Sequence, residues 1–84
     1  MFGKLADSFL RMFHIQARWD PDARVWVAES DDLPGLCTES PSLEALHAKL
    51  KALVLELIEL NHVAVYGSFA NYQLIVDDQV SLSV

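Results

Sequence analysis

The chain has 84 residues, which is enough for one domain with a modest hydrophobic core. Twelve acidic and six basic residues give it a formal net charge of -6, which argues against a nucleic-acid surface, because phosphate binding needs clustered Lys and Arg. A hydrophobic content of 52% excludes a disordered chain, and no apolar run approaches the roughly 20 residues of a membrane-spanning helix. We therefore expect a cytoplasmic protein that by itself binds neither nucleic acid nor a membrane.

Residues 1–11 admit two interpretations. Phe2, Leu5 and Phe9 follow the spacing of a short amphipathic helix. Alternatively, Met12 starts the natural protein, and residues 1–11 are an upstream extension. In both cases we expect a single domain over residues 1–84, with its core within residues 12–84.

The next segments predict a β-hairpin. Residues alternate from Met12 to Trp19, as in a strand with one buried face. One side of this strand carries Phe13, Ile15, Ala17 and Trp19, and the other carries His14, Gln16 and Arg18. Residues 20–24 combine Asp and Pro, which favour a turn. Residues 25–30 are rich in β-forming side chains and are expected to return antiparallel to the first strand.

A second corner and the start of a helix follow. The Asp-Asp-Leu-Pro-Gly sequence of residues 31–35 predicts a corner, and residues 36–38 predict a short third strand. Ser42 is the expected N-cap of the helix, because its hydroxyl can accept a hydrogen bond from a backbone amide of the first turn. Ser40, followed by Pro41 at the first helical position, is the rival assignment.

Leucines at three- and four-residue spacing predict one long amphipathic helix that ends at Asn61, with His47 at the boundary of its apolar stripe. Residues 62–71 are compatible with a short strand or a loop. Residues 72–84 are expected to form a last strand with a bulge near Asp77 and Asp78. The predicted class is therefore α+β, an antiparallel sheet in the order β-β-β-α-β with one long helix packed on one face.

Acidic side chains are concentrated around the two corners and could be considered as a metal site. The residues concerned are Asp20, Asp22, Glu29, Asp31, Asp32 and Glu39. Mg²⁺ prefers carboxylate ligands, so a degenerate metal-dependent nuclease is one alternative. Most of these acids lie in predicted turns, however, where Asp is common for backbone reasons. We expect solvated turn acids, with no metal and no cofactor, that can also meet a basic partner.

The remaining reactive side chains do not suggest catalysis. His14, His47 and His62 are too scattered for a zinc site, and the single cysteine cannot complete one. Cys37 follows Leu36 in a short strand, which favours a buried thiol. Ser40 and Ser42 are interpreted as caps. No catalytic residue is therefore expected, and the chain is predicted not to be an enzyme.

Trp19 and Trp26 are large enough to anchor either a core or an interface. Only one face of the predicted sheet is covered by the helix. Two interpretations follow: both tryptophans pack within the monomer, or one of them, Trp26, lies on a binding face outside the core.

Several ordered motifs resemble a known family. They are Trp19-Asp20-Pro21-Asp22, Val25-Trp26-Val27-Ala28, Asp32-Leu33-Pro34-Gly35-Leu36, Thr38-Glu39 and Ser42-Leu43-Glu44-Ala45-Leu46, followed by the helix that ends at Asn61. The chain is similar over Phe13 to Asn61 to the HicB-like antitoxin domains, closest to short uncharacterised bacterial proteins of that family. The resemblance implies a partial ribonuclease-H-like fold that binds and occludes a small toxin nuclease of a toxin–antitoxin system and performs no chemistry itself.

The chain departs from the family after Asn61. Full antitoxins of this family usually carry a DNA-binding segment, whereas only 23 residues remain here and none is Lys or Arg. We therefore expect a non-enzymatic protein-binding domain that sequesters a small basic partner and forms a homodimer through a strand edge or a sheet face. The predicted partner-binding residues are Asp20, Asp22, Trp26, Asp31 and Asp32. A structural adaptor without a toxin partner is the other alternative.

Overall fold

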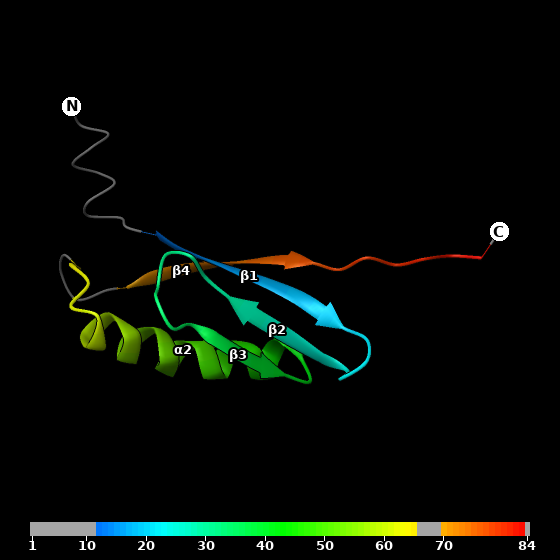
Figure 1. Cartoon of the computed structure of the whole chain (residues 1–84), viewed down its shortest axis with the longest axis horizontal. Coiled ribbons are helices and arrows are strands. Elements are labelled where there is room, and N and C mark those ends of the chain that lie inside the picture. Colours follow the sequence, from blue (N-terminus) through cyan, green and yellow to red (C-terminus); the bar gives the residue numbers. More distant parts are fainter. Residues whose placement is uncertain (1–11, 66–69, 84) are drawn as a thin grey trace, which may run out of the picture.

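The computed structural model describes residues 12–65 and 70–83. This part of the chain contains β1 (Met12–Asp20), β2 (Val25–Glu29), β3 (Cys37–Ser40), α2 (Leu43–Leu60) and β4 (Asn71–Asp77). The strands form one sheet in the order β3-β2-β1-β4, and α2 lies along one face of it (Figure 1). The predicted α+β class and the predicted order of three strands, a helix and a strand are confirmed. The expected helix or extension in residues 1–11 lies outside the described residues.

The sheet is mixed, so the prediction of an antiparallel sheet is wrong for its last strand. β1 pairs antiparallel with β2, with Trp19 opposite Trp26, and β2 pairs antiparallel with β3. β4 instead pairs parallel with β1, with Phe13 beside Tyr72. The helix is the reason. It carries the chain back along the sheet after β3, so β4 starts at the same end as β1 and runs in the same direction.

The hydrophobic core lies between α2 and the sheet. Phe13, Ile15 and Ala17 of β1 are at most 1% exposed, which confirms the alternation predicted for this strand. From the helix and the corner after β2, the core receives Leu33, Leu36, Leu46, Leu50, Val54 and Leu57. The helical leucine stripe and the Leu-Pro-Gly corner therefore pack against the same face of the sheet.

Both ends of α2 are fixed by local hydrogen bonds. Ser42 is the N-cap, and its hydroxyl accepts a hydrogen bond of 3.1 Å from the amide of Ala45. This confirms Ser42 and makes the rival assignment to Ser40 wrong. Asn61 is the C-cap, as predicted. His62 follows with φ of 53°, and Val63 N donates to Ile58 O at 3.0 Å, so the helix ends in a Schellman motif with His in the place usually taken by Gly.

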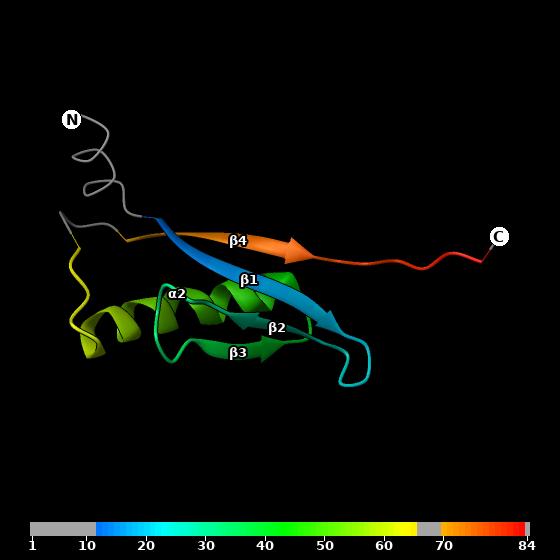
Figure 2. The same ribbon diagram turned by 45° about the horizontal axis from the view of Figure 1, so that its top comes forward.

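The third and fourth strands differ from their predicted bounds. β3 begins one residue late, because Leu36 turns into the core before the strand starts. Residues 63–65 are not in a strand, and residues 66–69 lie outside the described residues. The expected bulge near Asp77 is wrong: β4 ends at Asp77, and residues 78–83 continue without strand pairing, past the end of the sheet (Figure 2).

Candidate functional site

The face of the sheet turned away from α2 is the main candidate surface, and we call it the open face. Strand alternation and register place on it His14, Gln16, Arg18, Val27, Glu29, Cys37, Glu39, Gln73, Ile75 and Asp77. Among the described elements, only α2 packs against the sheet, and it does so on the opposite face (Figures 1 and 2). The open face is therefore a mixed polar and apolar surface to which all four strands contribute side chains.

A cleft of about 340 Å³ crosses this face. Its lining includes Arg18, Val27, Glu29, Asp31, Ile75 and Asp77. Ile75 is 45% exposed, and Val27 is half-buried, so the cleft has apolar surface available for burial. Arg18 Nη2 lies 3.5 Å from Glu29 Oε1, but both side chains are more than half exposed, so this ion pair contributes little to stability. The cleft therefore combines three carboxylates, one partly neutralised cation and an apolar strip.

The predicted partner-binding acids do not form one cluster. Asp20 and Asp22 lie at the β1–β2 turn, whereas Asp31 and Asp32 follow the other end of β2, whose five residues span about 17 Å. Asp20 Oδ1 accepts hydrogen bonds from the amides of Asp22 and Ala23 at 3.0 and 3.2 Å, which is the turn-forming role predicted for it. Of the four acids, Asp31 lines the cleft of the open face.

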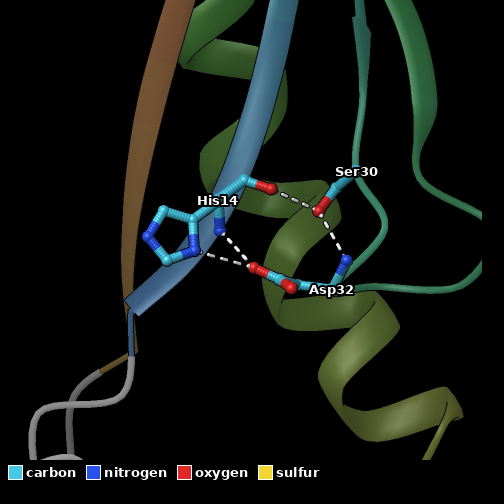
Figure 3. Close-up of polar contacts among 3 residues, drawn as sticks. All are labelled: His14, Ser30 and Asp32. Carbon is cyan, nitrogen blue, oxygen red and sulfur yellow. Dashed lines mark hydrogen bonds and ion pairs between the residues drawn. The ribbon is translucent and has the colours of Figure 1, made fainter.

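Asp32 belongs to a polar cluster that the sequence did not predict (Figure 3). Its Oδ2 accepts a hydrogen bond of 2.6 Å from His14 N and lies 3.1 Å from His14 Nδ1. Ser30 Oγ donates to His14 O at 2.5 Å and accepts from Asp32 N at 3.1 Å. The serine hydroxyl therefore binds a backbone carbonyl and not the imidazole, so these residues do not form a nucleophile–base pair. They fasten the loop after β2 to β1.

The tryptophans are neighbours on the helix-covered face. Their ring centroids are 5.3 Å apart, with an interplanar angle of 60°, an edge-to-face arrangement across β1 and β2. Trp26 is partly buried against the core, whereas Trp19 is 36% exposed. The expectation that Trp26 lies on a binding face outside the core is therefore wrong. Trp26 lies two residues before the buried Ala28 in β2, so both side chains point to the helix-covered face of the sheet.

Cys37 is exposed, so the prediction of a buried thiol is wrong. Its apolar neighbour Leu36 is buried just before β3, but Cys37 pairs with Glu29 and therefore belongs to the open face. His47 lies half-buried at the edge of the helical stripe, as predicted. Its Nδ1 is 2.6 Å from the Tyr72 hydroxyl, and burial raises the pKa of Tyr72 above its ordinary value of 10.0.

Two further features concern metals and membranes. Within residues 12–65 and 70–83, no three His, Cys, Asp or Glu side chains are placed together so that they could hold a metal ion. Over the same residues, no helix combines the length and the apolar character that crossing a membrane requires.

Comparison with known proteins places the chain in a family. Residues 12–82 match the family model described as "Domain of unknown function (DUF1902)". The chain belongs to this family. A similar solved structure is the crystal structure of hypothetical protein TTHA1013 from Thermus thermophilus, an extremely thermophilic bacterium. The two sequences are 46% identical over 88% of this chain and 100% of that chain, with a TM-score of 0.67. No curated protein matches the chain. The resemblance to HicB-like domains is named in neither match and stays a prediction.

Proposed function

We propose that this chain is a non-catalytic protein-binding module that resembles a HicB-type antitoxin domain with its partial ribonuclease-H-like fold. It binds a small basic protein, such as a toxin nuclease, in the cytoplasm. The observation that supports this proposal most directly is the cleft of the open face, where exposed Ile75 lies among the carboxylates of Glu29, Asp31 and Asp77.

The chemistry of the cleft favours a cationic partner. Arg18 is its only basic lining residue among those described and is already paired with Glu29, so the remaining carboxylates are available to Lys or Arg of a partner. The net charge of -6 attracts such a partner over a longer range and speeds its association. Burial of Ile75 and Val27 beneath the basic surface of the partner would supply apolar contact, as in the centre of ordinary protein interfaces.

The proposal changes the predicted set of partner-binding residues. Asp31 remains in it, and Glu29, Ile75 and Asp77 join it because strand pairing brings them beside Asp31. Asp20 and Asp32 are assigned to backbone hydrogen bonds instead, and Trp26 to packing.

The test is co-expression of the chain with the product of the adjacent gene, followed by measurement of the dissociation constant by calorimetry. The double change Asp31→Lys and Asp77→Lys reverses two carboxylates of the cleft. It is expected to weaken the complex by about a hundredfold or more, because it places like charges at the interface.

The matched control is Glu56→Lys with Glu59→Lys, which makes the same change in net charge on exposed positions of α2. This control is expected to weaken binding only severalfold. Equal loss in both double variants would mean that only net charge matters, and failure of the neighbour to bind the original chain would reject the toxin-binding proposal and leave the structural adaptor.

A further inference from the structure

The segment after β4 is built like a strand but has no strand beside it among the described residues. Residues 78–83 extend past the sheet (Figure 1) and alternate apolar with polar side chains. Val80 is 72% exposed and Leu82 is 82% exposed. Beyond Gln79 this segment cannot continue the pairing of β4 within its own sheet, because the parallel register places Gln79 beside Asp20, where β1 ends.

β4 itself presents a matching free edge. It pairs with β1 on one side, and it is the last strand of the described sheet. Its apolar side chains on the helix-covered face are incompletely buried: Tyr72 and Leu74 are half-buried, and Val76 is 42% exposed. The reason is that the backbone of α2 runs nearest to β3 and β2, which lie toward the opposite edge of the sheet from β4.

A groove remains between α2 and β4. It measures about 200 Å³ and is lined by Lys51, Val54, Leu55, Ala70 and Tyr72. Leu55 is 61% exposed and lies outside the buried stripe of the helix. The helix-covered face beside β4 is therefore apolar and open along the same edge at which no strand of the described sheet pairs with β4.

The segment and the edge have the same alternation. Tyr72, Leu74 and Val76 occupy even positions, as do Val80 and Leu82, so all five point to one side of a continuous strand. If two such strands run antiparallel about a two-fold axis at Asp78, Val80 lies opposite Val76, and Leu82 lies opposite Leu74. In this register every exposed apolar residue of the segment meets an apolar residue of β4.

We propose that two copies of this chain form a symmetric dimer in which residues 78–83 of each copy pair antiparallel with the free edge of β4 of the other. Val80 and Leu82 then extend the core beside Val76 and Leu74, toward the groove under α2. The two four-stranded sheets become one continuous sheet, and each free β4 edge is covered. This proposal does not depend on the identity of a toxin partner, because it uses the backbone edge and the helix-covered side of β4, whereas the cleft is lined by β4 side chains on the open face.

The register also explains what limits the strength of the dimer. Asp78 of one copy faces Asp78 of the other at the two-fold axis, and like charges directly opposite each other destabilise a strand pair. The change Asp78→Asn is therefore expected to tighten the dimer severalfold, and added salt is expected to do the same for the unchanged chain.

The first test measures the dimer dissociation constant of the full chain by sedimentation over a concentration series. Val80→Ser with Leu82→Ser is expected to weaken the dimer by at least about tenfold while the circular dichroism spectrum stays the same, because these side chains contact little of their own monomer. Ser81→Thr with Ser83→Thr, on the opposite side of the segment, is expected to leave the constant unchanged within about twofold. A monomeric full chain, or a dimer unaffected by the Val80 and Leu82 changes, would overturn the proposal.

The second test fixes the register by cross-linking in a Cys37→Ser background. Asp78→Cys places two thiols directly opposite each other, with Cα atoms about 4.5–5.5 Å apart, within reach of a disulfide. Ser81→Cys is the control, since its two copies lie six residues apart along the ladder, about 20 Å. Rapid oxidation to a disulfide dimer is expected for the first variant and not for the second. Equal cross-linking of both would reject this register and the dimer built on it.

Discussion

At the scale of single residues, the aspartate side chains have different roles, and these roles depend on the groups that lie next to each carboxylate. Asp20 and Asp32 accept backbone amide hydrogen bonds, whereas Asp22 and Asp31 are exposed. Their shared charge explains why composition predicted an acidic binding surface. Their hydrogen bonds explain why only part of that acidic set is available to a partner.

The contact between Asp32 and His14 leads to a stability prediction. Asp32→Ala removes the acceptor of the 2.6 Å hydrogen bond from His14 N and releases the loop after β2. We expect the free energy of unfolding to fall by about 1 kcal/mol, less than for a buried charged hydrogen bond, because both side chains are partly exposed. Urea denaturation measures the change. Asp31→Ala, at the exposed neighbouring carboxylate, is the control, and a loss as large as that of Asp32→Ala would contradict the role of this contact.

Tyr72 leads to a prediction about alkaline pH. Burial raises its pKa in the folded state above 10.0, because the phenolate is poorly solvated there. The unfolded chain therefore loses this proton at lower pH than the folded chain does. The resulting stabilisation is complete below pH 10.0 and is lost as the pH rises above it. Measured from neutral pH upward, the free energy of unfolding should fall less steeply above pH 10.0 in Tyr72→Phe than in the unchanged chain. Identical slopes would contradict this prediction.

At the scale of elements, the boundary between β3 and α2 depends on two serines with opposite environments. Ser42 Oγ accepts a hydrogen bond from Ala45 N and caps the helix. Ser40 is 2% exposed, and its hydroxyl has no hydrogen-bond partner among the described residues. A buried hydroxyl without a partner is unfavourable, so the two side chains contribute to stability with different signs.

Replacing each serine by alanine tests this difference. Ser42→Ala is expected to lower the free energy of unfolding by about 1 kcal/mol, the usual cost of losing an N-cap. Ser40→Ala is expected to leave it unchanged or raise it by up to about 1 kcal/mol, because it removes an unsatisfied polar group. Each variant is the control for the other in thermal or urea denaturation. A larger loss for Ser40→Ala would show that its hydroxyl is satisfied in solution.

At the scale of the whole molecule, one helix cannot cover a four-stranded sheet on both faces. Among the described residues, α2 covers the inner face of β1, β2 and β3, covers the inner side of β4 only in part and leaves the open face uncovered. A chain of 84 residues buries a limited core, so a partner that covers these surfaces would add to the buried area. The two uncovered regions differ in character: the cleft of the open face is acidic, and the β4 edge is apolar. We accordingly propose a basic partner for the first and a second copy for the second, and each proposal can fail without the other.

Much of the fold could be predicted from short-range patterns. The alternation in β1 identified Phe13, Ile15 and Ala17 as core residues, and the cap residues Ser42 and Asn61 set the ends of the helix. These features depend on residues a few positions apart. The candidate site could be predicted less well, because its cleft joins Asp31 to Ile75 and Asp77 through strands that are distant in sequence.

The sequence by itself determined the elements, their order and which face of the first strand is buried, because periodicity and capping act within a few residues. Only the tertiary structure decided that β4 runs parallel to β1, that Cys37 faces solvent and that Asp32 binds His14, 18 residues earlier. It also decided that Tyr72 meets His47, 25 residues before it. These outcomes depend on where the helical crossover returns the chain to the sheet. That position is set by the packing of the whole core and not by any local pattern.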